Sequence, residues 1–201
     1  MINAIVFDWG GVLIDNPADG LIEFCSSSLK ISPDILKSEL SKIMTDFQRG
    51  SISETDLWKK ICSHLQIKEP TASSLWRNAV DNVFKDNKKV YELVKKLRSN
   101  GYKTGLLSNT EIPTTEYFYD NGYEKYFDSV AFSCVEKSIK PEAKIFNILL
   151  GRLGTKPQET IFIDDKLKYV ESAEELGIRG ILFHDSNDLV VKLKSLGINT
   201  N

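Results

Sequence analysis

Residues 5–12 read IVFDWGGV, and no other stretch says as much about the architecture of the chain. A short apolar run that ends at an aspartate and a Gly-Gly turn is typical of a buried strand in a parallel sheet. Two later segments have the same form, GLLSNT at residues 105–110 and IFIDD at residues 161–165. Because ligands bind beyond the carboxyl ends of such strands, we expect the polar side chains that follow them to share one small volume.

A lysine completes this set of polar residues. The segment SIKP at residues 138–141 places Lys140 directly before the expected start of a helix, where the helix dipole favours an anion. Carboxylates together with one lysine and a hydroxyl suit a phosphate group and a divalent cation. Each residue alone also fits an ordinary role, such as a helix cap or a surface lysine, so the prediction depends on their joint order. The expected cluster comprises Asp8, Ser108, Asn109, Lys140, Asp164 and Asp165.

Helices and strands alternate along the chain after residue 88. This alternation favours an α/β fold with one doubly wound parallel sheet, because each parallel strand needs a crossover connection. The predicted strands cover residues 4–7, 104–107, 129–132, 160–163 and 180–183. The predicted helices of this part cover residues 90–98, 113–119, 141–153, 167–176 and 189–196.

The segment from about residue 15 to 82 has helical periodicity and no convincing strand. It predicts helices at residues 33–49, from 53 to about 65, and at 71–83, with Trp58 and Trp76 in their core. We therefore expect an α/β core formed by residues 1–14 and 86–201, and a small all-helical cap formed by residues 15–85. An insert after the first strand lies over the strand ends, where it can act as a lid.

The composition argues against several other classes of protein. The 201 residues carry a net charge of −2 and 41% hydrophobic residues, so neither nucleic acid nor an anionic membrane is an expected partner. The three cysteines are scattered, which predicts reduced thiols, and two distant histidines do not form a catalytic or metal centre. We expect a cytoplasmic protein, because neither a secretory signal nor a membrane span is evident, and the sequence assigns no oligomeric state.

In their order along the chain these motifs resemble those of the haloacid dehalogenase-like hydrolases, in the subgroup with a helical cap. The segments that carry the resemblance are FDWGGVL, LLSNT, KPEAKIF and FIDD, at residues 7–13, 106–110, 140–146 and 162–165. The segment QRGSIS at residues 48–53 resembles a cap turn of the sugar-phosphatase-like branch.

The resemblance implies a role for each residue of the expected cluster. Asp8 would be the nucleophile that forms an aspartyl phosphate, and Lys140 would steady it together with the phosphoryl group. The phosphate-binding residues would be Ser108, Asn109 and Lys140. A Mg²⁺ cofactor would be bound by Asp8, the Gly10 carbonyl, Asp165 and the neighbouring Asp164.

The chain departs from the family pattern at Gly10. Phosphatases of this family usually carry a second aspartate there, which acts as general acid and base, and its loss costs roughly 10²–10⁴-fold in rate. Three explanations are open: a sugar 1-phosphate with a better leaving group, a carboxylate supplied by Asp15 or Glu111, or binding with little turnover. For Asp15, a cap on the first helix of the insert is the favoured role.

The sequence thus predicts a Mg²⁺-dependent phosphatase that hydrolyses a small phosphorylated metabolite, such as a hexose 1-phosphate. The alternative is a catalytically weak or inactive relative that binds phosphorylated ligands or a protein partner. A haloacid dehalogenase is less favoured, because those enzymes dispense with Mg²⁺ and lack paired acids like Asp164 and Asp165.

Overall fold

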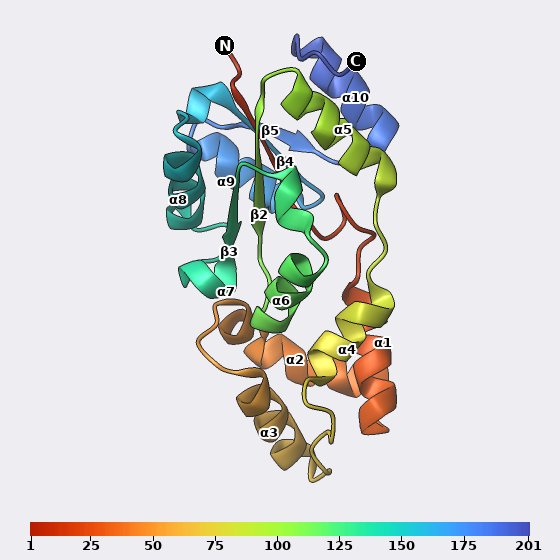
Figure 1. Ribbon diagram of the computed structural model, residues 1–201. Coiled ribbons are helices and arrows are strands. Elements are labelled where there is room, and N and C mark those ends of the chain that lie inside the picture. Colours follow the sequence, from red (N-terminus) through yellow and green to blue (C-terminus); the bar gives the residue numbers. More distant parts are fainter.

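Five parallel strands form one sheet in the computed structural model, which describes all 201 residues (Figure 1). Each predicted strand is present, with ends within one residue of the prediction, and the doubly wound α/β fold is confirmed. Across the sheet the order is β3 (Ser129–Phe132), β2 (Lys103–Ser108), β1 (Ala4–Phe7), β4 (Thr160–Asp164) and β5 (Arg179–Leu182). The chain fills one side of β1 first and then the other, and parallel sheets bind ligands where the order reverses in this way.

Successive side chains of the strands point to opposite faces of the sheet, so each face has its own hydrophobic cluster. On β1, Ile5 and Phe7 belong to one cluster, and Ala4 and Val6 belong to the other. Both faces are covered by helices, which explains why the strands are apolar throughout. The covering helices are α5 (Lys88–Ser99) and α10 (Ser186–Ser195) on the first face, and α8 (Ala143–Leu153) and α9 (Leu167–Glu175) on the second.

Several helix starts in the core differ from the prediction: α10 begins three residues earlier than expected, and α5 two residues earlier. The helix expected from Pro141 begins at Ala143, because its N-cap residue Glu142 has an extended backbone. Lys140 therefore lies in the loop ahead of α8 and not at the start of the helix. The other short elements of the core are α6 (Ile112–Asp120), α7 (Ser133–Glu136) and two 3₁₀ turns at Tyr123–Tyr126 and Pro157–Glu159.

The inserted segment is all-helical and has a hydrophobic cluster of its own, which includes Trp58 and Trp76. Its first helix, whose bounds were not predicted, begins after Asn16, whose side-chain oxygen accepts a hydrogen bond from the Ala18 N–H at 3.1 Å. The expected cap by Asp15 is therefore wrong. The four helices are α1 (Ala18–Leu29), α2 (Pro33–Gln48), α3 (Glu54–Leu65) and α4 (Leu75–Val83), so the last begins four residues later than expected.

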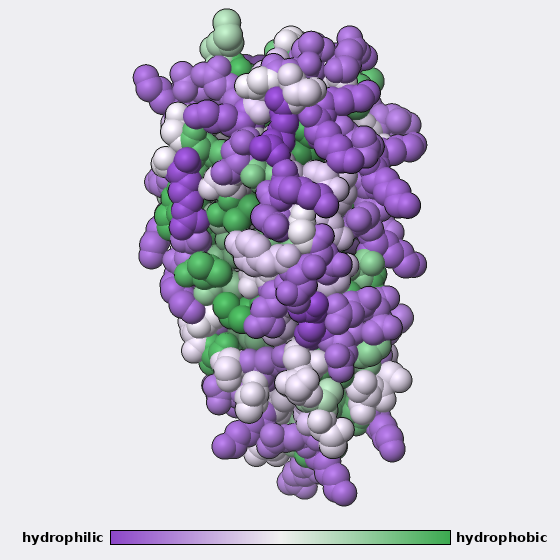
Figure 2. All heavy atoms as spheres, in the orientation of Figure 1, coloured by the Kyte–Doolittle hydropathy of each residue, from purple (hydrophilic) through white to green (hydrophobic).

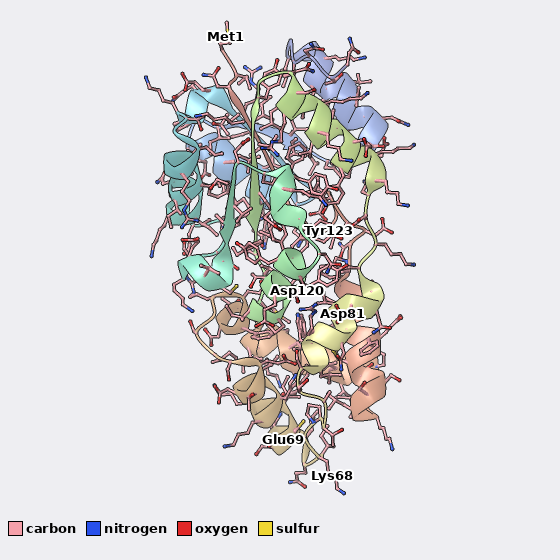
Figure 3. All side chains as sticks on the ribbon, viewed as in Figure 1. Met1, Lys68, Glu69, Asp81, Asp120 and Tyr123 are labelled. Carbon is pink, nitrogen blue, oxygen red and sulfur yellow. The ribbon has the colours of Figure 1, made fainter.

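The helical insert covers one end of the sheet domain, and both termini lie at the opposite end (Figure 1). Figure 3 shows Met1 at one extreme of the molecule, and Lys68 and Glu69, from the connection between α3 and α4, at the other. The surface is mainly hydrophilic in the view of Figure 2. None of the helices combines the length and the apolar character that crossing a bilayer requires.

Candidate active site

Asp8 directly follows β1 and is buried at the carboxyl edge of the sheet. Its N–H donates a hydrogen bond to the carbonyl of Ile163 on the neighbouring strand at 2.8 Å. The turn after Asp8 needs glycine at Gly11, which has φ +84° and where a Cβ would lie 2.5 Å from an oxygen of Asp165. The absence of a side chain at this point lets the first turn and the end of β4 approach each other.

Lys140 connects the two strand ends. Its Nζ lies 2.8 Å from Oδ1 of Asp8 and 2.6 Å from Oδ2 of Asp164, and only 1% of its side chain is exposed. The same nitrogen lies 4.9 Å from the centre of the Tyr169 ring. A buried ammonium needs partners of this kind to offset its lost hydration. The structure thus brings together Asp8, Lys140 and Asp164, which the sequence placed in one cluster.

Asn109 bonds to the backbone of the lysine, in addition to lining the cavity described below. Its Oδ1 accepts a hydrogen bond from the Lys140 N–H at 2.8 Å, and its Nδ2 donates to the Lys140 carbonyl at 3.0 Å. Asn109 therefore fixes the loop that carries the lysine. Ser108, the last residue of β2, is buried at the cavity and makes no side-chain hydrogen bond within the protein, so its hydroxyl is free for a ligand.

The three carboxylates at this edge are held in an unfavourable environment. Burial raises the pKa of Asp8 to about 6, because the attraction of Lys140 offsets only part of the desolvation. Burial also raises the pKa values of Asp164 and Asp165. For Lys140, burial acts to lower the pKa, but Asp8 and Asp164 outweigh it and the pKa is raised. The lysine is therefore a stable cation, and the cluster has more carboxylates than cations.

The geometry of the carboxylates fits a divalent cation. One oxygen from each of Asp8, Asp164 and Asp165 lies within 4.8 Å of the others, and Oδ1 of Asp165 is buried without any hydrogen-bond partner. Asp164 is already engaged, since its two oxygens accept from Lys140 Nζ and from the Lys166 N–H at 2.9 Å. Carboxylate oxygens are the ligands that Mg²⁺ prefers. Asp8 and Asp165 are thus better placed to bind a metal than Asp164.

A cavity of about 340 Å³ lies between the sheet edge and the helical insert. From the core it is lined by Asp8, Gly10, Ser108, Asn109, Glu111, Lys140, Lys166 and Tyr169, and from the insert by residues of α1, α2 and α4 and the connection before α1. Asp15 does not line it and borders a separate surface depression beside Asp165. Of the two carboxylates considered as substitutes for the missing acid, only Glu111 faces this cavity.

Glu111 also joins the core to the insert. Its carboxylate accepts hydrogen bonds from Gln48 Nε2 at 3.0 Å, from Trp76 Nε1 at 3.2 Å and from Thr114 Oγ1 at 3.0 Å. Burial raises its pKa. Gln48 and Trp76 lie far from it in the sequence, so no local pattern reveals this group. Trp76, assigned to the core of the insert, is buried there but also reaches the cavity.

The turn after α2 is docked on the core. Arg49 makes two hydrogen bonds to the carboxylate of Glu142, at 3.1 and 2.6 Å. The Ser133 hydroxyl donates to the carbonyl of Gln48, and Lys137 Nζ donates to that of Gly50, each at 2.6 Å. The segment that resembles a family cap turn therefore makes one of the contacts between the insert and the core.

A sequence model of the haloacid dehalogenase-like hydrolases matches residues 2–177, which include all four helices of the insert and every residue of the carboxylate cluster. The chain belongs to this family of hydrolases. Membership confirms the resemblance read from the motifs, and it agrees with the sheet topology and with the inserted helical domain.

Relatives of known activity are similar over nearly the whole chain. The sesquiterpene phosphatase astK of Aspergillus oryzae is 28% identical, over 96% of this chain and 95% of its own length. The D-ribitol-5-phosphate phosphatase of Bacteroides thetaiotaomicron is 28% identical, over 88% of this chain and 89% of its own. The crystal structure of the family enzyme bt-2542 from the same bacterium, in complex with magnesium and inorganic phosphate, superposes with a TM-score of 0.79 at 25% identity. It covers 94% of this chain and 99% of that one.

Proposed function

We propose that this hydrolase is a Mg²⁺-dependent phosphatase that acts on a small phosphorylated metabolite through an aspartyl phosphate on Asp8. The observation that carries the proposal is the position of Asp8, which is buried, paired with Lys140 at 2.8 Å and open to the cavity under the helical insert. The relatives that are phosphatases support the reaction class. Their named substrates differ, so the hexose 1-phosphate suggested by the motifs is one candidate among several.

The reaction follows from groups at the sheet edge. A carboxylate oxygen of Asp8 attacks phosphorus, the bond from phosphorus to the alcohol oxygen breaks, and the alcohol takes its proton from water because Gly10 offers none. Water then attacks the phosphorus of the aspartyl phosphate, which releases inorganic phosphate and regenerates the carboxylate. Lys140 and Ser108 hold phosphoryl oxygens during both steps. Asp164 and Asn109 keep Lys140 in position for this purpose.

The proposed Mg²⁺ would be bound by Asp8, the Gly10 carbonyl and Asp165, whose buried oxygen has no other partner. When bound it supplies positive charge that offsets the repulsion between the carboxylate and the phosphate. We further propose that residues 15–85 act as a cap that opens and closes over a core of residues 1–14 and 86–201, and that the protein acts in the cytoplasm.

The proposal is tested by incubating the protein with Mg²⁺ and a panel of phosphorylated compounds and measuring free phosphate. The panel includes acetyl phosphate, sugar phosphates and alkyl phosphates, each with a chelator control. We expect phosphate release that depends on Mg²⁺. Specific binding of a phosphorylated ligand without turnover of any compound, acetyl phosphate included, would instead favour the non-catalytic alternative.

A further inference from the structure

The cavity has two chemically different halves. The half formed by the sheet edge is polar and contains Asp8, Ser108 and Lys140. The opposite half is formed by helices of the insert, which lie below the sheet in Figure 1. A phosphate ester that places its phosphoryl group on the first half must place its alcohol part against the second. The side chains of the insert therefore select the alcohol.

Most of that second half is apolar. On α1 and α2 the cavity-lining side chains follow helical spacing, so each helix presents one stripe to the cavity. These stripes include Leu21, Ile22, Leu40 and Met44, and Trp76 from α4 adds an aromatic ring. The remaining apolar members are Pro17 and Ala18. We call this half of the cavity, formed by residues of the insert, the wall. It offers dispersion contacts and few hydrogen-bonding groups.

The polar side chains of the wall are few, and most of them make at least one hydrogen bond within the protein. The Asn16 side-chain oxygen accepts from the Ala18 N–H, and the Ser41 hydroxyl donates to the Ser38 carbonyl at 2.7 Å. Gln48 donates to Glu111, and the Trp76 N–H donates to Glu111 and to Thr114. Lys37 is exposed and lies 3.9 Å from Asp19. The Asn16 amide NH₂, the Gln48 Oε1 and the Lys37 ammonium remain available to a ligand, so the wall offers a bound hydroxyl few partners beside its seven apolar residues.

We propose that the substrate is a phosphate monoester whose alcohol part is predominantly apolar, such as an alkyl or aryl monophosphate, and not a sugar phosphate. This inference rests on the proposed phosphatase activity and names the substrate class of the same site. Most hydroxyls of a sugar would lose their hydrogen bonds to water against the seven apolar residues of this wall, and burying a polar group without a partner disfavours such a substrate. An apolar chain gains binding energy with each methylene that it buries there.

The test is a series of primary phosphate esters in which only the alcohol changes. Ethyl, butyl and hexyl phosphate are compared with glucose 6-phosphate, whose leaving group is also a primary alcohol. Acetyl phosphate measures the phosphatase reaction itself, because its small acetyl group does not need to contact the apolar side chains of the insert. We expect kcat/KM to rise by roughly fourfold per buried methylene and hexyl phosphate to exceed glucose 6-phosphate at least about tenfold. The same esters, used as competitive inhibitors of acetyl phosphate hydrolysis, give the preference where turnover is slow.

The outcomes separate the two proposals. The apolar substrate is overturned if acetyl phosphate is hydrolysed but kcat/KM does not rise along the alkyl series, or if kcat/KM is higher for glucose 6-phosphate than for hexyl phosphate. Either result leaves the phosphatase proposal in place. No hydrolysis of acetyl phosphate overturns the phosphatase, and the inference that rests on it fails as well.

Two variants of α2 test whether the wall causes the preference for apolar alcohols. Met44→Gln keeps the length and helix propensity of the side chain but adds an amide to the cavity. We expect it to lower the ratio of kcat/KM for hexyl phosphate to that for acetyl phosphate by about tenfold. Ile35→Gln is the matched control, because Ile35 lies on the same helix but is 46% exposed and does not line the cavity. Equal ratios in the two variants would show that the wall does not select the alcohol.

Discussion

Asp8 is both the proposed nucleophile and a source of instability in the metal-free protein. A carboxyl group whose pKa is raised by folding favours the protonated folded state, so its ionisation makes the fold less stable as the pH rises from about 4 to about 6. The rise from 3.8 to about 6 corresponds to roughly 3 kcal/mol above that range. Asp8→Asn removes this charge and keeps the shape of the side chain.

We therefore expect Asp8→Asn to abolish phosphate release and, without metal, to stabilise the protein at pH 7. Urea unfolding in the presence of a chelator measures the free energy of unfolding. The gain over the unmodified protein should reach at most roughly 3 kcal/mol above pH 6 and disappear below pH 4. Full turnover by the folded variant would refute the assignment of the nucleophile.

Gly10 is the residue at which the missing acid can be restored. A Cβ added to Gly10 would meet Pro17 Cδ at 3.4 Å, an ordinary contact, and the φ angle of Gly10 is not in the left-handed region. Gly10→Asp should raise kcat for alkyl phosphates by roughly 10²–10⁴-fold if proton transfer to the leaving alcohol limits the rate. Acetyl phosphate, whose leaving group needs no proton, should gain little. A folded variant that binds Mg²⁺ without this difference between alkyl phosphates and acetyl phosphate would argue against a missing acid.

The sequence predicted which residues lie at the sheet edge better than it predicted the hydrogen bonds that hold them in place. Asp8, Ser108, Asp164 and Asp165 follow or end strands, and the edge of a parallel sheet necessarily brings such positions together. The role of Asn109 in fixing Lys140 could not be predicted, because it depends on the path of a loop 31 residues further along the chain.

The turn after α2 is the element that depends most on close packing between insert and core. Gly50 has φ +65°, and a Cβ there would collide with the Cys134 carbonyl and lie 2.6 Å from Lys137 Nζ. Gly122 is a matched position, with φ +67° and no atom nearer than Lys125 Nζ at 3.9 Å. An alanine at either position would be strained by the positive φ angle, but only at Gly50 would its Cβ also collide with a neighbouring element.

Gly50→Ala should therefore cost more stability than Gly122→Ala, by about 1–3 kcal/mol, which is the range for overpacked sites. Denaturant unfolding of the two variants gives the difference. Gly50→Ala should also raise KM if the turn holds the proposed cap over the cavity, whereas Gly122→Ala should leave KM unchanged. Equal losses would mean that the contact with Cys134 relaxes at no cost.

Among the elements, strands were predicted more accurately than helix starts for a physical reason. A strand that is buried on both faces is a continuous apolar run, and its ends are marked by the first polar residues. A helix start depends on one capping residue, and α4 begins where Ser74 accepts from the Arg77 N–H and not at the preceding polar stretch. For α1 the capping oxygen comes from Asn16, followed by Pro17 with a helical backbone, and the neighbouring Asp15 offered an equally acceptable cap residue in the sequence.

In the whole molecule the insert and the core have separate hydrophobic clusters, which Phe84 and Tyr117 connect, and polar contacts cross the boundary on both sides. Figure 3 shows Asp81 and Asp120 near each other where α4 meets α6, and Arg77 bonds to both, at 2.9 and 2.7 Å. Arg49 and Glu142 make a second ionic contact on the other side of the boundary. Partly exposed ion pairs contribute little to stability, so such a boundary can open without unfolding either part.

Arg49→Gln should consequently shift the insert towards an open arrangement while barely changing the melting temperature, by about 2 °C or less. Faster amide hydrogen exchange in residues 48–53 and a higher KM would report the opening. Arg152→Gln is the matched control, because Arg152 makes the same kind of two-bond contact with Glu136, at 2.7 and 2.9 Å, entirely within the core. The control should change neither the exchange of residues 48–53 nor KM. If both variants behave alike, the Arg49–Glu142 pair does not hold the insert closed, and the buried group of Gln48, Trp76 and Glu111 must do so.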